Sequence, residues 1–438
     1  MANDPATFER AKALFIEGVT HFEAGDAAAA ERCFEASLAL VPARASTLVN
    51  LGAARVRLGK HQQALQALEQ SIALDASQPD AWEHRGVASA GLGRVADSIA
   101  SFERALALDA QSLSAQFHLG CMLNEGRQHT RALTVFERLL AAEATRGEAW
   151  FRHGQTLQAL DRHDEALGSY ERALSLDAAQ PQAWINRGGI LREAGRHAEA
   201  AASYRQALAQ GGDPEMVAFC LASVERSAAL PAAAPRAHVQ GLFDDYAGQF
   251  DQHLLQVLHY RGHEVLGRAL RAAAQGRRFA HALDLGCGTG LCGVQLQPLA
   301  VRIDGVDLAA NMLAQARQRG VYERLEQGDI AAHLASTDRR YDLVAAADVF
   351  TYVGALDEVF AGVARVLQAD GLFGFAVEAA DDAPDGFVLR PSLRYAHARG
   401  YLEALAQRHG FGVRSLQRQP IREDQRTTID AWYGVLSR

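Results

Sequence analysis

The chain has 438 residues, of which 49% are hydrophobic and 22% are charged, and its formal net charge is −8. Two or three globular domains are expected at this length. Because the charge is acidic overall, a nucleic-acid or anionic-membrane partner would gain no electrostatic attraction, and we predict neither.

The amino-terminal residues and the cysteines indicate the cellular compartment in which the protein is expected. Residues 1–15 contain no basic region followed by an apolar run, and no window of 18 residues is continuously apolar. We therefore expect no signal peptide and no membrane span. The five cysteines match no disulfide framework or zinc-ligand spacing. The sequence thus predicts a reduced, cytoplasmic protein without a bound metal.

The first half of the chain repeats with a period of 34 residues. A small residue follows each repeat glycine by twelve positions, and a large apolar or aromatic residue follows four positions later. The repeat glycines are Gly18, Gly52, Gly86, Gly120, Gly154 and Gly188. Paired helices need small residues where their backbones approach and bulky residues beside them. Since one helix pair cannot bury its apolar face alone, the pattern predicts a stack of helix pairs.

This pattern resembles the tetratricopeptide repeat, in six copies over about residues 11–214. Residues 214–230 are predicted to form a capping helix that closes the helical solenoid. Residues 231–236, with the sequence PAAAPR, are predicted to be a linker.

The sixth position of each repeat is polar in five successive copies. These positions hold Ile16, Asn50, His84, His118, Arg152 and Asn186. In the repeat family this position faces the concave groove, so the resemblance implies a row of donors that could bind the backbone of an extended protein or peptide partner. The alternative interpretation is that the groove is polar only because water covers it.

From about residue 237 the period ends and predicted strands alternate with helices. Strands are predicted over 281–286, 302–308, 322–330, 341–350 and 371–379, helices over 291–300, 309–319, 356–368 and 397–410, and a closing strand pair over 411–419 and 427–438. This order is typical of an α/β domain with a parallel sheet covered on both faces. Such sheets bind ligands at the carboxyl ends of their strands.

A glycine-rich turn follows the first of these strands. Gly286, Gly288 and Gly290 stand at alternate positions behind Asp284. Bare backbone lets a ligand approach closely, and either a dinucleotide or S-adenosylmethionine would use such a turn. Asp284 would repel a diphosphate but attract the ammonium and sulfonium of S-adenosylmethionine. The charge therefore favours S-adenosyl-L-methionine as cofactor.

Two further acids follow the next strands. Asp307, with Leu308 beside it, ends the second strand, where an acid can hold both ribose hydroxyls. Asp329 follows the third strand and would accept a bond from the adenine amino group, while Ile330 would pack on the adenine ring. Each acid alone is also typical of a helix cap, but the ordered set on successive strands favours a cofactor site.

Residues 237–438 thus resemble the class I, Rossmann-like S-adenosylmethionine-dependent methyltransferases. Segments 242–266 and 390–411 are similar to a group of bacterial methyltransferases fused to tetratricopeptide repeats. The resemblance implies a seven-stranded sheet whose last strand is antiparallel. It also implies that Ala347 touches the cofactor through its backbone and that Tyr246 or Phe250 covers the cofactor, although core packing explains these two aromatics equally well.

Methyl transfer needs a base only when the acceptor must lose a proton. His397 and Tyr395 are the predicted catalytic residues, and plain structural roles remain open for both. The other candidates near the expected cavity are Asp348 and Glu378. Arg394 and Arg422 would hold an acidic substrate or lie solvated on the surface.

The sequence thus predicts a methyltransferase whose repeats recruit a protein. Three alternatives stay open. The repeats could serve assembly only, the second half could be a scaffold that binds cofactor without turnover, or it could be an NAD-dependent oxidoreductase.

Overall fold

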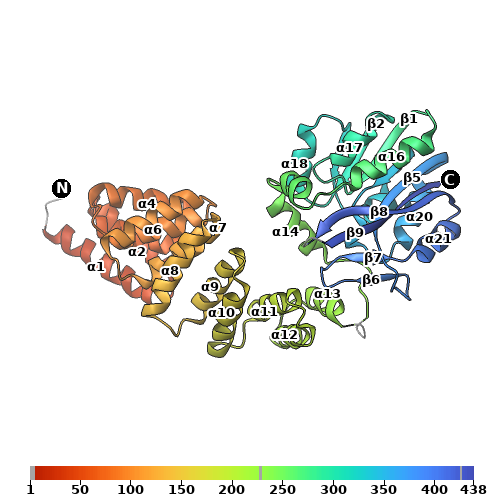
Figure 1. Cartoon of the computed structure of the whole chain (residues 1–438). Helices are drawn as coiled ribbons and strands as arrows, with labels where there is room; N and C mark the ends of the chain where they lie inside the picture. Colours follow the sequence, from red (N-terminus) through yellow and green to blue (C-terminus); the bar gives the residue numbers. More distant parts are fainter. Residues whose placement is uncertain (1–4, 226–228, 425–426) are drawn as a thin grey trace. The chain divides into compact units, whose positions relative to one another are not determined.

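The computed structural model describes residues 5–225, 229–424 and 427–438. The chain divides into two compact units, Met1–Ile190 and Leu191–Arg438 (Figure 1). Each unit is described by itself below. Within the described ranges, no helix is both long and apolar enough to cross a bilayer.

An all-helical solenoid forms the amino-terminal part, as the period of 34 predicts (Figure 1). The first ten helices form five consecutive pairs in contact, and the described residues 5–209 contain twelve helices in all. They are α1 (Pro5–Glu23), α2 (Ala27–Leu40), α3 (Ala45–Arg57), α4 (His61–Leu74), α5 (Pro79–Ala90), α6 (Val95–Leu108), α7 (Leu113–Glu125), α8 (His129–Ala142), α9 (Gly147–Ala159), α10 (His163–Leu176), α11 (Pro181–Glu193) and α12 (His197–Ala209).

The repeat glycines lie where the two helices of a pair touch. A Cβ added to Gly86 would stand 2.7 Å from the ring of Phe102, and one added to Gly154 would stand 2.7 Å from the ring of Tyr170. Both rings are almost completely buried. Only glycine fits at such a contact, because a Cβ there would overlap the ring. This close approach explains why glycine and a large residue recur sixteen positions apart.

Helix α13 (Pro214–Val224) follows the last pair. The Asp213 side chain caps it by accepting a hydrogen bond from the backbone N of Glu215 at 2.9 Å. The predicted capping helix extended to residue 230, and its residues 226–228 lie outside the described residues. The predicted domain boundaries stay predictions.

The predicted linker over 231–236 makes ordered main-chain contacts. Ala233 forms an antiparallel bridge with Val353. The backbone N of Ala234 donates to the carbonyl of Tyr352 at 2.9 Å, and the backbone N of Gly354 donates to the carbonyl of Ala232 at 2.8 Å. This segment is therefore part of the α/β fold that follows it.

One mixed sheet forms the centre of the second unit, with the strand order β3-β2-β1-β4-β5-β9-β8. The first five strands are parallel, and β9 is antiparallel to both of its neighbours. Their bounds are β1 (Phe279–Leu285), β2 (Ala300–Asp307), β3 (Arg324–Gln327), β4 (Tyr341–Ala346), β5 (Leu367–Ala379), β8 (Gly412–Asp424) and β9 (Thr427–Ser437).

Helices cover both faces of this sheet, as the alternation predicts. Along β4, Val344 packs in one apolar cluster with α19, α20 and α21, whereas Leu343 and Ala345 pack in a second cluster with α16 and α17. The helices of the unit are α14 (Arg236–Tyr246), α15 (Phe250–Gln252), the π-helical turn η1 (His253–Val257), α16 (Gly262–Ala274), α17 (Leu291–Leu296), α18 (Ala310–Gln318), α19 (Ile330–Ser336), the 3-10 turn η2 (Phe350–Tyr352), α20 (Asp357–Val366) and α21 (Arg399–Arg408).

The sheet differs from the expected seven strands by a short hairpin, β6 (Phe387–Leu389) and β7 (Tyr395–His397). β7 runs parallel to the last residues of β5, with Glu378 beside Ala396. β9 occupies the other edge of β5 at Glu378. β7 therefore lies on the same edge of β5 as β4, which pairs with residues nearer the start of β5. The helix predicted to begin at residue 397 begins at Arg399 instead, because His397 ends β7.

Candidate functional site

A cavity of about 580 Å³ opens at the carboxyl ends of the parallel strands. It is lined by the loops that follow β1, β2, β3 and β4, at residues 286–289, 307–308, 328–331 and 347–349. Segments 232–234 and 250–254 also contribute to its wall. This is the edge at which open α/β sheets bind their ligands.

The glycine turn after β1 forms one side of the cavity. Gly286 and Gly288 line it, and both have positive φ angles, +65° and +52°. A Cβ at Gly286 would stand 2.4 Å from the Cβ of Val349, whereas one at Gly288 would meet no atom of the described residues within 4 Å. Gly290, with φ +92°, does not line the cavity in the described chain. Glycine is therefore required for backbone geometry at all three positions and for protein packing at Gly286.

Asp284 lies behind this turn and is fully buried. Its carboxylate accepts a hydrogen bond from the hydroxyl of Tyr322 at 2.7 Å, and its Oδ1 atom has no hydrogen-bond partner in the described residues. Burial raises the pKa of Asp284 to about 7. The side chain does not reach the cavity wall among the described residues, so its charge would act on a ligand through the turn.

Asp307 lines the cavity and fixes the glycine turn. Its Oδ2 atom accepts from the backbone N of Gly288 at 2.8 Å, and its Oδ1 atom accepts from the backbone N of Ala309 at 2.9 Å. Burial raises the pKa of this carboxyl as well. Leu308 lies beside it in the wall. The acid predicted at the end of the second strand thus joins two strand-end loops at the cavity.

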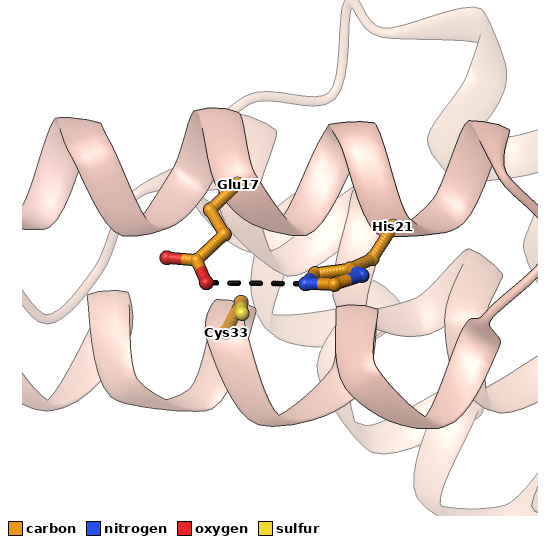
Figure 2. Close-up of side chains that lie close together, drawn as sticks. All are labelled: Glu17, His21 and Cys33. Atoms are coloured by element: carbon orange, nitrogen blue, oxygen red, sulfur yellow. Dashed lines mark ion pairs between the residues drawn. The ribbon is translucent and has the colours of Figure 1, made fainter.

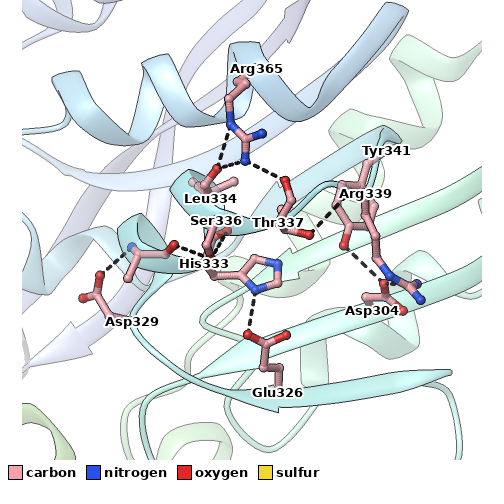
Figure 3. A network of polar contacts seen from close by, with 11 residues as sticks. Asp304, Glu326, Asp329, His333, Leu334, Ser336, Thr337, Arg339, Tyr341 and Arg365 are labelled. Atoms are coloured by element: carbon pink, nitrogen blue, oxygen red, sulfur yellow. Dashed lines mark hydrogen bonds and ion pairs between the residues drawn. The ribbon is translucent and has the colours of Figure 1, made fainter.

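Asp329 and Ile330 stand where β3 leads into α19, and both line the cavity. Asp329 caps α19 by accepting from the backbone N of Ala332 at 2.9 Å. At the other end of the helix, Arg365 donates to the carbonyls of Leu334 and Thr337, and this network is drawn in Figure 3. Asp329 therefore serves as a helix cap and also presents its carboxyl group at the cavity.

The segment from α14 to η1, which precedes the first strand, forms another side of the cavity. Of the two predicted aromatics, Phe250 lines the cavity and Tyr246 does not, within the described residues. Next to Phe250, the Asp251 carboxylate accepts from the hydroxyl of Thr289 at 2.5 Å and pairs with Arg319. These contacts tie α15 to the glycine turn.

Four charged side chains gather at and behind the cavity wall that follows β4. Asp348 and Arg394 line the cavity, and Ala347 precedes them in the wall. Behind them, Arg422 forms an ion pair with Glu378, and each of these two residues is only 3% exposed. Arg422 is therefore neither solvated surface nor exposed to a substrate. Burial raises the pKa of Asp348 to about 6, although Arg422 opposes that shift.

The predicted catalytic pair lies elsewhere. His397 and Tyr395 are fully buried and do not line the cavity of the described chain. His397 Nε2 lies 3.0 Å from the carbonyl of Gly354, and the Tyr395 hydroxyl donates to the carbonyl of Pro231 at 2.9 Å. Burial lowers the pKa of His397 to about 4. Both contacts hold the β6–β7 hairpin in place, and a catalytic role for either residue stays a prediction.

Comparison with known proteins finds two kinds of domain in the chain. Residues 282–371 match the family model of a methyltransferase domain. Tetratricopeptide-repeat models match residues 9–77 and, in overlapping pieces, residues 49–214. The chain therefore carries tetratricopeptide repeats followed by a methyltransferase domain.

Several curated relatives resemble the methyltransferase domain. A malonyl-acyl-carrier-protein O-methyltransferase of Enterobacter lignolyticus is 32% identical over 131 residues, which are 29% of this chain and 52% of that protein. One from Geobacter sulfurreducens is 40% identical over 108 residues, 24% of this chain and 40% of that protein. A trans-aconitate 2-methyltransferase of Paracidovorax citrulli is 32% identical over 114 residues, 25% and 41% of the two chains. The chain thus spans about half or less of the length of these relatives.

The helical part is similar to a solved structure, YrrB, described as a tetratricopeptide-repeat protein with an unusual peptide-binding site. The identity is 20%, the match covers 42% of this chain and 95% of that chain, and the TM-score is 0.39.

Several cavity residues of the methyltransferase domain were not foreseen. Phe243, Tyr352 and Ala232 line the cavity beside Phe250. Phe243 lies seven positions before Phe250, and their rings meet edge to face at 5.8 Å. That helical spacing was a usable signal for Phe243. No local signal marks Ala232, because it reaches the wall only through its bonds to the turn at Gly354 and Ala355.

Proposed function

We propose that the methyltransferase domain binds S-adenosyl-L-methionine in this cavity and transfers its methyl group to an acceptor. The observation that carries the proposal is the convergence of the glycine turn, Asp307 and the Asp329–Ile330 pair on one cavity. The bound cofactor would supply an electrophilic methyl carbon on a positively charged sulfur. The protein's contribution is then mainly to align the acceptor and to exclude water.

The charges of the cavity support a cationic ligand. Five carboxyl side chains but only two arginines line its described wall. The carboxyl groups are Asp307, Asp329, Asp348, Asp357 and Glu358. A cationic sulfonium and ammonium suit this wall, whereas a diphosphate would be repelled. The Oδ1 atom of Asp348 has no hydrogen-bond partner in the described residues, although Arg422 Nη1 lies 3.9 Å from it, so it can still accept a hydrogen bond from a ligand.

Each residue of the site has a proposed part. Asp307 would hold the ribose hydroxyls, and the turn at Gly286 and Gly288 would let the amino-acid tail pass close to the backbone. Ile330 would pack on the adenine ring beside Asp329. Asp348 is the group placed to take a proton from the methyl acceptor or to orient that acceptor by accepting a hydrogen bond from it.

Titration calorimetry tests which cofactor binds and how its affinity depends on pH. S-adenosylmethionine and S-adenosylhomocysteine should bind, and NAD should not. Affinity for S-adenosylmethionine should rise from about pH 5.5 to about pH 7.5, because Asp284 and Asp348, with pKa values of about 7 and about 6, ionise there. A nearby cation favours the ionised carboxyls, so binding of S-adenosylmethionine releases protons. Its affinity should therefore rise by at most about tenfold per pH unit for each group.

Two controls sharpen this titration. S-adenosylhomocysteine lacks the sulfonium charge and should show a shallower rise, and Asp284→Asn should flatten the rise for S-adenosylmethionine. The stability of the ligand-free protein should depend on pH in the opposite direction. Both folded-state pKa values exceed the usual aspartate value, so its stability should fall as the pH rises from about 4 to about 7. Binding of NAD alone would contradict the proposal, and binding without methyl transfer in a radiolabel assay would favour the non-catalytic scaffold.

We further propose that the repeats bind a protein or peptide partner through their groove. The five polar side chains at the sixth repeat position stand on successive first helices, α3, α5, α7, α9 and α11, and all are half-buried. The two asparagines among them are held by hydrogen bonds. Asn50 Nδ2 donates to the carbonyl of Ser46 at 2.9 Å, and Asn186 Nδ2 donates to the hydroxyl of Tyr170 at 3.2 Å. Such fixed amides lose little entropy when they bind a peptide backbone.

The double variant Asn50→Ala/Asn186→Ala tests the groove. It should weaken capture of partner proteins about thirtyfold, by roughly 1 kcal/mol for each of the two lost hydrogen bonds, and leave S-adenosylmethionine affinity unchanged. The matched control is Thr130→Ala/Thr134→Ala, which removes two exposed side chains from the second helix α8. Quantitative pull-down followed by mass spectrometry measures both. Equal capture by the two double variants would remove the groove from the function.

A further inference from the structure

Three side chains that can ligate a metal converge on the first helix pair (Figure 2). Glu17 and His21 lie one helical turn apart on α1, and Cys33 faces them from α2. One ligand atom from each lies within 4.8 Å of the other two, and His21 Nε2 is 3.9 Å from Glu17 Oε1. Among the residues that the structure describes, no other group of three His, Cys, Asp or Glu side chains comes together in this way.

The repeat pattern does not require a glutamate or a cysteine at the positions of Glu17 and Cys33. One period later, the positions of Glu17 and Cys33 hold Leu51 and Ala67. Both of these residues are buried and pack against Ala30 and Phe34 of the first pair. The same positions in the first pair are exposed or half-buried, so polar residues there need no special explanation. Packing alone would also allow a half-buried cysteine, but here the thiol faces two further side chains that can ligate a metal.

We propose that Glu17, His21 and Cys33 bind a divalent transition-metal ion, with zinc as the ion that suits them best. Thiolate, imidazole and carboxylate are the three zinc ligands of proteins, and sites with three protein ligands keep a fourth position for water. A thiolate and a carboxylate together carry the charge that neutralises a divalent ion. The thiol proton passes to solvent when the metal binds.

The geometry leaves a small adjustment. Tetrahedral zinc with bonds of about 2.0–2.3 Å places its ligand atoms roughly 3.3–3.7 Å apart. The widest allowed separation here, 4.8 Å, must therefore shorten by about 1 Å. Glu17 has a side chain that is 59% exposed and His21 one that is 40% exposed, so both have room to turn. The bound metal would link α1 to α2 and stabilise the first pair, while the methyl-transfer cavity belongs to the other unit.

Cobalt titration of the metal-free full chain tests this site. Co²⁺ bound to a thiolate gives a charge-transfer band in the near ultraviolet, and we expect one equivalent to saturate it and Zn²⁺ to abolish it. Mg²⁺, which prefers oxygen ligands, should have no effect. Cys33→Ala should remove the band, and His21→Leu should weaken cobalt affinity at least tenfold.

The matched control is Cys121→Ala, which removes another half-buried cysteine from α7 and should leave the band unchanged. Alanine already stands at the position of Cys33 in the second repeat, so the folded state of Cys33→Ala should persist, which circular dichroism checks. A second readout is the melting temperature, which zinc should raise in the wild type and in Cys121→Ala but not in Cys33→Ala. Absence of the band in the wild type, or an equal band in Cys33→Ala, would overturn the proposal.

Discussion

Replacing Asp307 by alanine should lower the affinity for S-adenosylmethionine about a hundredfold while the protein stays folded. The carboxylate lines the cavity and also accepts two main-chain hydrogen bonds that shape the glycine turn. Charge-assisted hydrogen bonds contribute about 1.5–3 kcal/mol each, and about 2.7 kcal/mol corresponds to a hundredfold change. Titration calorimetry at constant pH measures the loss.

Asp342 supplies a closely matched control. Its carboxylate is also buried and accepts two main-chain bonds, from Ala280 at 2.7 Å and from His281 at 2.8 Å, but it does not line the cavity of the described chain. Asp342→Ala should therefore lower the melting temperature about as much as Asp307→Ala and leave the affinity nearly unchanged. Equal affinities for the two variants would show that Asp307 does not hold the cofactor.

The largest loss of stability should come from Arg422→Met. Arg422 and Glu378 form an ion pair in which each partner is 3% exposed. Without the arginine, the Glu378 carboxylate is left buried beside Arg394, whose Nη1 atom is 4.0 Å away. Breaking a buried pair by removing one partner costs about 3–5 kcal/mol. The measurement is the unfolding transition that we expect S-adenosylmethionine to shift, which would identify the methyltransferase domain.

A second substitution and a control on the same strand complete this experiment. Arg422→Met with Glu378→Gln should recover more than half of the lost stability, because the buried carboxylate that Arg422 neutralises is then gone as well. Arg418 also lies on β8, but its pairs with Asp430 at 3.0 Å and with Asp381 at 2.9 Å are exposed. Arg418→Met should cost less than about 1 kcal/mol. If Arg422→Met cost no more than this control, the buried pair would not stabilise the domain.

The architecture was largely predictable because it is periodic. Six glycines at intervals of 34 residues require helix pairs with close contacts, and the alternation of strands and helices in the second half requires a covered parallel sheet. Both predictions of fold class are confirmed. The β6–β7 hairpin was missed because strands of three residues are too short to show a period of two.

The site was predictable where a residue's place follows from the end of a strand. Asp307 is the last residue of β2, Asp329 stands two residues after the end of β3, and both reach the cavity. The burial and the partners of the other site residues depend on contacts between positions far apart in the sequence. Asp284 is fully buried because Tyr322, 38 positions later, covers it, and Glu378 meets Arg422 across 44 positions. No local pattern in the sequence records such pairs, so the burial and altered pKa of Asp284 could not be foreseen.

Helix α13 has a consequence for how this chain can vary during evolution. Its Phe219 packs against Tyr395 of β7, with ring centres 6.2 Å apart, in one apolar cluster with Ala222, Ala234 and Leu389. Arg192, at the end of α11, donates to the carbonyl of Pro391 in the same hairpin. Gene duplication can therefore lengthen or shorten the solenoid upstream of α11 at little cost. Recombination between α13 and α14 would break an apolar core, so the final helix has to be inherited together with the domain that follows it.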